Sequence, residues 1–589
     1  MVEANLKEIE LEIQSTHMKI EKAKNDIDYT LKLYNEHTEK YAISKYEPKI
    51  KAYKNVSLND FNKDTLWIIM GYGFGYGIKK ILDYRGAFRH KVIVIEPNEE
   101  LLKYQMEFEP INEDEIIFFS GTDFTKLREI LTIYNEKIIL GEFCIITNKV
   151  YLYFYEEYFK YINDILKNNI MHARLMYGFA AIRTMEEIEH TILNYNFIKN
   201  SYFLSDLTKY KNVPAVIVSA GPSLSKNIDQ LKDFNGLIFV VSRNINSIYE
   251  RNIEADFIVH ADSNDFTFNL LKENTCLDYP MICSNHSNYN LLEKYKGIKY
   301  FTTNGRKTCE GLGLEINKLT YAISVSVLAM SAAIHLKCNP IIFIGQDVAF
   351  TDDKFHDIGS RDEEEIKNFK IPKNFILTKA FDEKSEVKTS EMFLGIKENI
   401  EGHIKDNPDI NFINATEGGA YIEGCTHMSL KNVIEKYNPE SKIKIEHVKP
   451  FQSNVKVDLK DIIIEIEEVL SLVKSLLDLC NDINEAIKYK NIENIRIKYA
   501  KIEELLDQID QYTVHHLVSI LELSSRVQKR TEDAEEILNE KLKMVKNNDL
   551  EEIYNEYSRS IKNFKIDYEL VQENLGKILE LLKTEYRKG

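Results

Sequence analysis

The 589-residue sequence lacks the features that mark several classes of protein. No apolar run approaches the roughly 18–20 residues needed to cross a bilayer. The charged start, MVEANLKEIELEIQ, is not that of a signal peptide. A net charge of −17 argues against a general basic surface for nucleic acid. These absences predict a soluble, cytoplasmic protein with no membrane span and no nucleic-acid partner.

Paired cysteines and common catalytic motifs are also missing. The seven cysteines are scattered with no CxxC pair, which predicts reduced thiols rather than a disulfide framework or a zinc site. The chain has no HExxH, no Walker loop and no GxSxG. The adjacent acids Asp352 and Asp353 lie in a charged stretch, where we interpret them as a solvated turn rather than a metal site.

Glycine and proline are unevenly spread, and their distribution divides the chain. Residues 1–60 contain no glycine and are rich in Lys, Glu, Ile and Tyr, which predicts an N-terminal helical arm. From 451 to 589 both residues become scarce while Leu and Ile recur every three or four positions, which predicts an all-helical C-terminal domain. A chain of this length exceeds one hydrophobic core, so several domains are expected.

Two α/β domains are predicted between these ends. Residues 61–200 hold four short apolar runs, at 65–70, 91–95, 115–119 and 143–147, followed by a helical connector. A glycine turn, Gly71 to Gly77, and the acidic Glu96 resemble a dinucleotide-binding fingerprint. The spacing G-x-G-x-G-x-G is not the usual one, however, and favours a tight turn without a ligand.

Residues 201–450 predict a Rossmann-like central domain with a ligand site. Its apolar runs each end in small or polar residues, and the carboxyl ends of parallel strands line a crevice. Gly221 would let the backbone approach a ligand, Pro222 fits a first helical turn, and free N–H groups there favour a phosphate. The five polar ends are 219–223, 242–246, 260–262, 345–347 and 416–419.

Three histidines are candidates for a general base, because a pKa near 6.5 suits proton transfer at neutral pH. They are His260, His356 and His427, and the first is equally compatible with a structural role. Asp262 and Asp347 could orient the base or hold ligand hydroxyls. The charged, loop-like residues 351–400 predict a mobile lid or an acceptor-binding segment.

Three motifs resemble the bacterial motility accessory factors, which attach nonulosonic acids to Ser and Thr of flagellin. The motifs are Val218-Ser-Ala-Gly-Pro-Ser-Leu224, Ile344-Gly-Gln-Asp-Val-Ala-Phe-Thr351 with His356, and Asn414-Ala-Thr-Glu-Gly-Gly-Ala420 with Glu423-Gly-Cys-Thr-His427. The order of three domains resembles the same family. Its central domain is similar to bacterial sialyltransferases that use CMP-activated sugars, act by inversion and need no metal or cofactor.

The resemblance implies that Gly221, Pro222, Ser223 and Asn244 hold the nucleotide and that Ser324 contacts the donor. The other polar strand ends add Asp262, Gln346, Thr416 and Gly418 as donor-binding candidates, and His356, Asp347 and His427 as catalytic candidates. The sequence departs from the sialyltransferases at two tyrosine positions, where Ala349 and Phe355 lack a hydroxyl. Thr351, Lys354 and His356 are replacement candidates.

The leading hypothesis is therefore a glycosyltransferase that moves a pseudaminic, legionaminic or sialic-type acid from CMP to flagellin. A homo-oligomer is compatible with the sequence. Two alternatives remain open. One is a magnesium-dependent diphosphotransferase similar to the hydroxymethylpterin pyrophosphokinases, and the other is a non-enzymatic flagellin export or chaperone factor.

Overall fold

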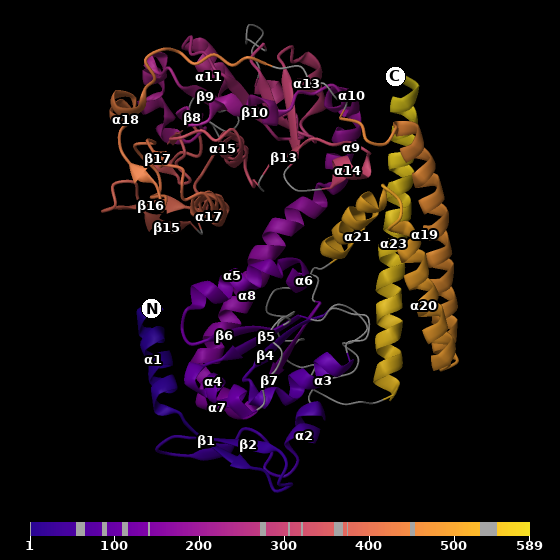
Figure 1. Cartoon of the computed structure of the whole chain (residues 1–589). Helices are drawn as coiled ribbons and strands as arrows, with labels where there is room; N and C mark the ends of the chain where they lie inside the picture. Colours follow the sequence, from indigo (N-terminus) through magenta and orange to yellow (C-terminus); the bar gives the residue numbers. More distant parts are fainter. Residues whose placement is uncertain are drawn as a thin grey trace. The chain divides into compact units, whose positions relative to one another are not determined.

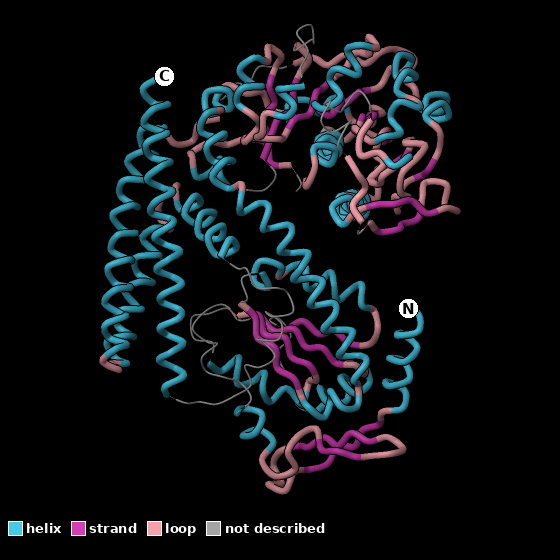
Figure 2. The backbone as a smooth tube through the Cα atoms, turned by 180° about the vertical axis from the view of Figure 1, so that it is seen from behind, coloured by secondary structure: helices cyan, strands magenta, loops and turns pink. Residues whose placement is uncertain are grey.

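The computed structural model describes residues 2–54, 65–84, 91–108, 116–139, 142–270, 278–303, 307–319, 322–357, 369–373, 375–447, 454–529 and 550–588. They form two compact units, shown as ribbons and as a backbone tube in Figures 1 and 2. Unit 1 comprises Met1–Arg183, Ser475–Glu503 and Leu521–Val571. Unit 2 comprises Thr184–Lys474, Glu504–Ile520 and Gln572–Gly589.

Unit 1 is built on a parallel sheet of order β6-β5-β4-β7. The strands are β4 (Leu66–Met70), β5 (Lys91–Glu96), β6 (Ile116–Ser120) and β7 (Phe143–Thr147), which confirms the four predicted runs. Such runs are apolar throughout because both faces of the sheet are covered. The helices of this part are α3 (Tyr76–Tyr84), α4 (Glu99–Phe108), α5 (Phe124–Ile133), α6 (Asn135–Ile139), α7 (Lys149–Phe154) and α8 (Glu156–Ile182).

The predicted N-terminal helical arm is wrong beyond residue 15. Helix α1 (Val2–Ser15) is followed by an antiparallel sheet of β1 (His17–Lys22), β2 (Tyr29–Tyr34) and β3 (Glu39–Tyr41), and then by α2 (Pro48–Lys54). The physical reason is the period of the side chains. In β2, Leu31 and Leu33 are buried and their neighbour Lys32 is less so, a spacing of two that suits a strand and not a helix.

The glycine turn of unit 1 is filled by the protein itself. A Cβ on Gly71 would lie 2.9 Å from the ring of Tyr151. The buried carboxylate of Glu96 accepts the N–H of Tyr72 at 3.0 Å. Packing within the protein therefore accounts for Gly71 and Glu96, in line with the interpretation as a tight turn.

Unit 2 holds a nine-stranded parallel sheet within the described residues, of order β13-β12-β11-β10-β9-β8-β14-β17-β18. The chain runs from β8 outward to β13 and then returns to the other side of β8, so the strand order reverses between β8 and β14. The strands are β8 (Ala215–Val218), β9 (Leu237–Val241), β10 (Phe257–His260), β11 (Met281–Ser284), β12 (Lys299–Thr303), β13 (Asn317–Lys318), β14 (Ile341–Ile344), β17 (Phe412–Asn414) and β18 (Thr426–His427).

Short helices connect these strands. The predicted buried helix is α15 (Val325–His335), which packs on β8, β9 and β10. The other α-helices are α9 (Thr184–Leu193), α10 (Tyr195–Lys199), α11 (Ile245–Glu250), α12 (Phe266–Leu270), α13 (Tyr289–Lys294), α14 (Thr308–Gly311) and α18 (Leu430–Tyr437). The 3₁₀ turns within the described residues are η2 (Gly73–Gly75), η4 (Leu204–Tyr210), η5 (Pro222–Lys226), η6 (Ile228–Asp233), η7 (Ser242–Asn244) and η8 (Thr351–Asp353).

The predicted loop at 351–400 contains regular structure over much of its length. A hairpin of β15 (Ile376–Lys379) and β16 (Glu386–Thr389) precedes helix α17 (Glu391–Asp406). Asp382 stabilises the hairpin turn by accepting the N–H groups of Lys384 and Ser385. Ser390 caps α17 by accepting the N–H of Phe393. These elements were not predicted because the segment is highly charged. Residues 358–368, with the acidic run 362–365, lie outside the described ranges.

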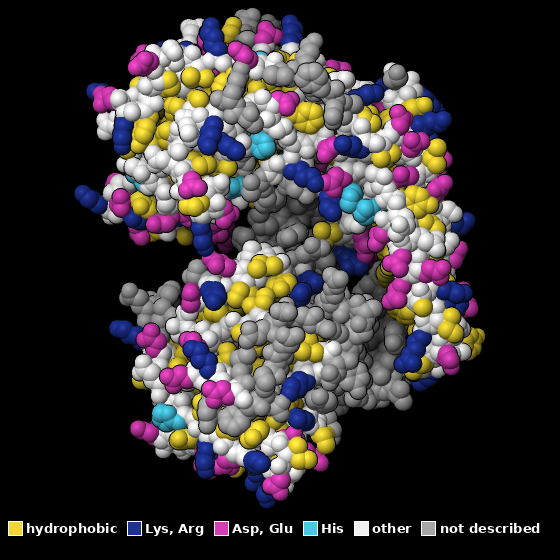
Figure 3. Space-filling model, in the orientation of Figure 1, with side chains coloured by type: hydrophobic (Ala, Val, Ile, Leu, Met, Phe, Trp, Pro, Cys, Tyr) yellow, Lys and Arg dark blue, Asp and Glu magenta, His cyan; other side chains and the backbone are white. Residues whose placement is uncertain are grey.

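The C-terminal segment is helical over most of its described part, as predicted. Its helices are α19 (Leu459–Lys488), α20 (Ile492–Ile509), α21 (His515–Lys529) and α23 (Leu550–Lys588), and each contributes residues to both units. No helix in the described ranges is long and apolar enough to cross a membrane. On the face in Figure 3, basic and acidic side chains are interspersed over the surface.

Candidate functional site

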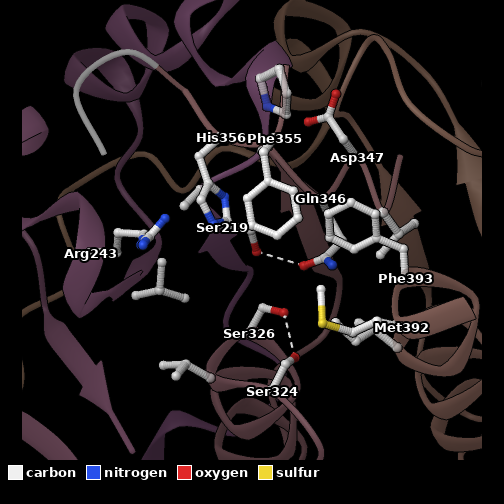
Figure 4. Close-up of a pocket in the computed structure, with 18 of the residues that line it drawn as sticks. Ser219, Arg243, Ser324, Ser326, Gln346, Asp347, Phe355, His356, Met392 and Phe393 are labelled. Carbon is white, nitrogen blue, oxygen red and sulfur yellow. Dashed lines mark hydrogen bonds between the residues drawn. The ribbon is translucent and has the colours of Figure 1, made fainter. Parts of the chain in front are cut away.

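A cavity of about 610 Å³ lies at the carboxyl ends of the strands in unit 2, where the strand order reverses. In open parallel sheets this reversal leaves a crevice, because the loops after the two strands diverge to opposite faces. Figure 4 shows part of its lining. The lining residues are Ser219–Pro222, Val241–Arg243, Asp262, Asn264, Phe266, Thr267, Ile323–Ser326, Gly345–Ala349, Phe355, His356, Met392, Phe393 and Ile396.

The structure brings seven of the twelve predicted site residues to this cavity. They are Gly221, Pro222, Asp262, Ser324, Gln346, Asp347 and His356. The other five lie outside its lining, namely Ser223, Asn244, Thr416, Gly418 and His427.

Asp347 fastens the loop after β14 to the loop after β8. Its Oδ1 accepts the hydroxyls of Ser223 and Thr351, each at 2.6 Å, and its Oδ2 lies 3.2 Å from the N–H of Ser223. Burial raises the pKa of this carboxyl, and the donated hydrogen bonds oppose the shift. Figure 4 shows the carboxylate directed away from the centre of the pocket. This arrangement suits a structural clasp better than a free base.

Glycines let these two loops touch. The N–H of Gly221 donates to the carbonyl of Gly345 at 2.7 Å. A Cβ on Gly221 would lie 2.2 Å from Oδ2 of Asp347, and one on Gly418 would lie 2.1 Å from Oγ of Ser223. Gly345 itself has φ +60, a backbone conformation that glycine adopts without strain.

Hydrogen bonds within the protein hold three of the predicted residues, namely Gln346, Thr416 and Asn244. The hydroxyl of Ser219 donates to Oε1 of Gln346 at 2.6 Å, and the N–H of Gln346 donates to the hydroxyl of the buried Thr416 at 3.1 Å. Asn244 is buried at the end of η7, with its amide nitrogen 3.5 Å from the carbonyl of Val218. These contacts orient the strand ends.

His356 is the one candidate histidine that lines the cavity. His260 is fully buried, and burial lowers its pKa to about 4, against the opposing effect of Asp262. The Nε2 atom of His427 lies 3.4 Å from the donating N–H of Ile422, and its ring stacks on Tyr421. Both contacts lie within the protein. His356 meets the cavity beside the ring of Phe355, 4.3 Å away between centroids.

Arg243 is a charged cavity residue that the sequence analysis placed in a polar strand end, 242–246, but did not single out. Among the described residues it is the one Lys or Arg in the lining. Its guanidinium lies 4.1 Å from the ring centre of Phe266, and Figure 4 shows it pointing toward the pocket. The sequence did indicate a place near the cavity for Arg243, because this residue lies between the end of a predicted strand and the candidate Asn244.

The start of α15 adds hydroxyls and helix N–H groups to the same cavity. Ser324 caps the helix by accepting the N–H of Val327, and its hydroxyl lies 3.0 Å from that of Ser326. The N-terminus of a helix carries a partial positive charge and favours an anion. Arg243 and this helix end are therefore two groups of the cavity that favour an anion, and Asp262 is the acidic lining residue on the loop after β10.

Helix α17 supplies an apolar wall. Met392, Phe393 and Ile396 line the cavity, and the ring of Phe393 stacks on that of Phe355 at 5.1 Å between centroids. The wall comes from the segment that the sequence predicted as a loop. Within the described ranges, no group of three or more His, Cys, Asp or Glu side chains is placed to hold a metal ion.

Comparison with known proteins bears on the fold. A family model described as "6-hydroxymethylpterin diphosphokinase MptE-like" matches residues 189–353. A solved structure, "Structure of MAf glycosyltransferase from Magnetospirillum magneticum AMB-1", aligns with 100% of this chain and 99% of that one, at a TM-score of 0.54 and 12% identity. A search of curated proteins finds no match. The chain thus shares its fold with that glycosyltransferase, which confirms the predicted fold class and bears out the resemblance at the level of the fold.

Proposed function

We propose that the chain is a glycosyltransferase that moves a nonulosonic acid from a CMP-activated donor to Ser or Thr hydroxyls of flagellin. The observation that carries the proposal is the cavity at the strand reversal, lined by Arg243 and hydroxyls, in a chain that shares the fold of a glycosyltransferase along its whole length. The reaction would take place in the cytoplasm, before flagellin is exported.

The donor half of the reaction needs a stabilised leaving group. The bond between the anomeric carbon and the phosphate oxygen breaks, and CMP leaves with the electron pair. Arg243 and the N-terminal N–H groups of α15 offer positive charge where that negative charge develops. These groups would serve in place of the tyrosine hydroxyls that Ala349 and Phe355 lack.

The acceptor half needs a base and a route for a polypeptide. As the acceptor oxygen bonds to the anomeric carbon, its proton must leave, and His356 is the lining residue suited to take it. Met392 both lines the cavity and has 57% of its surface exposed. Helix α17 therefore offers the acceptor chain an apolar contact at the cavity mouth.

A mass measurement tests the reaction. Purified protein is incubated with flagellin and with CMP-pseudaminic, CMP-legionaminic or CMP-sialic acid, and the flagellin is weighed by mass spectrometry. We expect a gain equal to one or more sugar residues with at least one donor. No gain with any of the three, together with no CMP binding by calorimetry, would exclude this function.

The role of His356 makes a separate prediction. His356→Ala should lower the transfer rate by roughly 10²–10⁴-fold, the usual contribution of a general base, and leave CMP affinity within about twofold. His37→Ala, an exposed residue of unit 1, is the matched control and should retain full transfer. Unchanged turnover in His356→Ala would remove it as the base.

The family model matched at 189–353 favours a second candidate, a diphosphate transfer from ATP to a hydroxymethylpterin. This reaction would require magnesium. Incubation with ATP, magnesium and 6-hydroxymethylpterin separates the two: AMP formation that depends on the pterin would support the diphosphotransferase and contradict the sugar transfer.

A further inference from the structure

Ser242 and His260 form a hydrogen-bonded pair behind the cavity. Strands β9 and β10 lie side by side, with Val241 opposite Val259, so the residues that follow these two are neighbours. The Oγ atom of Ser242 lies 2.9 Å from Nδ1 of His260. Ser242 is part of the cavity lining, whereas His260 is fully buried behind it. The histidine can therefore act on a ligand only through the serine.

The surroundings of the ring decide which atom of this pair is the donor. The Nε2 atom of His260 is buried and has no hydrogen-bond partner. Because burial lowers the pKa of His260 to about 4, the ring is neutral near pH 7 and carries one N–H. A proton on Nε2 would leave a buried N–H unsatisfied, which is rare, whereas a proton on Nδ1 leaves only a lone pair. The Nδ1–H group therefore donates to Ser242.

This direction of donation has a consequence for the cavity. The hydroxyl of Ser242 accepts from the histidine with one lone pair, so its own proton remains for another acceptor. The next residue, Arg243, directs its guanidinium toward the same space. A hydroxyl proton and a guanidinium side by side are suited to two oxygens of one anionic group.

We propose that His260 is a positioning residue that turns the Ser242 hydroxyl toward the cavity, where it donates, together with Arg243, to a phosphate of the ligand. This inference rests on the proposed function for the identity of the anion, a nucleoside monophosphate. Asp262 and His286 are the ionisable groups that affect the pKa of the ring, and Asp262 is also part of the cavity lining.

Calorimetric titration with CMP and with cytidine tests the pair, because only CMP carries the phosphate. Ser242→Ala should lower CMP affinity about tenfold, the size of one hydrogen bond to a charged group, and leave cytidine affinity unchanged. His260→Gln should do the same, since its longer amide reaches the position of Nε2. His260→Asn should keep the CMP affinity of the wild type, because its amide nitrogen lies where Nδ1 donates.

Several results would overturn the proposal. One is wild-type CMP affinity in Ser242→Ala, and another is an equal loss of CMP and cytidine. A third is a folded His260→Asn that binds CMP as weakly as His260→Gln. If neither His260 variant folds, the affinities of Ser242→Ala for CMP and for cytidine are the deciding measurement.

The proposed CMP donor can be wrong even if the role of the Ser242–His260 pair is right. If the wild type binds neither CMP nor cytidine, the proposed function fails, and inorganic pyrophosphate becomes the probe. Pyrophosphate binding that Ser242→Ala weakens would support the pair, whereas no pyrophosphate binding would overturn it.

Discussion

Several motif residues that the sequence suggests as ligand contacts also hold together the loops on which they lie. The clasp of Asp347 with Ser223 and Thr351, and the contact of Gly221 with Gly345, hold two loops together beneath the cavity. The residue best placed to meet an anion is Arg243, which belongs to none of the three motifs. A motif therefore marks where the site lies more reliably than which atoms face the ligand.

A pair of glycines tests this account of the loops. Gly221→Ala should lower the free energy of unfolding of unit 2 by about 1–3 kcal/mol, because the new Cβ would lie 2.2 Å from Asp347 Oδ2 and 2.4 Å from the Gly345 carbonyl. Gly402→Ala, in the interior of α17 with no atom within 4 Å of its Cβ, should raise it by about 0.5–1 kcal/mol. Calorimetric unfolding measures both. Equal stability of the two variants would contradict the close packing.

At the scale of elements, segments of high charge were the hardest to predict. The hairpin β15–β16 and helix α17 arise in a stretch without a long apolar run, and they depend on a side-chain turn at Asp382 and a cap at Ser390. The turn after β4 is a different case, because its glycines resemble a nucleotide-binding loop but their spacing indicated the tight turn that the structure contains. In that turn the buried Glu96 binds the backbone of the protein itself.

Glu96 should make the stability of unit 1 depend on pH. Burial raises its pKa to about 8, with hydrogen bonds from Tyr72, Tyr151 and Asn98 opposing the shift. The folded state thus holds a proton that the unfolded state loses above its ordinary value of 4.5. This contribution to stability is complete below pH 4.5 and declines as pH rises toward 8, by at most about 1.4 kcal/mol per pH unit.

The fluorescence of Trp67, the one tryptophan of the chain, reports this unit because it lies in β4. Thermal melts followed in this way should show a fall in melting temperature from pH 5 to pH 8 that is smaller in Glu96→Gln. Glu36→Gln, at an exposed position of the same unit, should melt like the wild type at each pH. Parallel curves for Glu96→Gln and the wild type would contradict a protonated Glu96.

At the scale of the whole molecule, each compact unit combines segments far apart in the chain. Within unit 1, Arg526 joins two such segments: it contacts Glu142 at 3.1 Å in the first, and Asp567 at 3.7 Å and Glu522 in its own. Within unit 2, Lys583 near the end of the chain pairs with Glu467. The C-terminal helices are thus part of the structure of both units rather than a separate appendage.

Arg526→Met should therefore destabilise unit 1, because three carboxylates would remain together without their cation. We expect a loss of about 2 kcal/mol, below the range for a fully buried pair because the side chain is partly exposed. The Trp67 signal during urea unfolding measures the change. Arg496→Met, at an exposed position of α20, should leave the midpoint unchanged. An equal midpoint in both variants would show that the cluster is not needed.

The sequence alone indicated parallel strands in two α/β domains and a cavity where the polar strand ends of the second domain meet. Apolar runs of four to six residues suit strands of a parallel sheet covered on both faces, and the polar residues after such strands meet at one edge of the sheet. The helical character of the C-terminal segment followed from its periodicity in the same way.

Only the tertiary structure decided which side chains reach the cavity and which are engaged within the protein. His260, His356 and His427 look equivalent in the sequence, yet one is buried behind Ser242, one lines the cavity and one accepts a backbone N–H. Periodicity constrains a residue relative to its own strand or helix, whereas burial and partners depend on how strands and loops pack, as with Ser242 on the strand beside His260. Arg243 became a candidate for the same reason, because α15 and the loop after β14 form the other sides of its cavity.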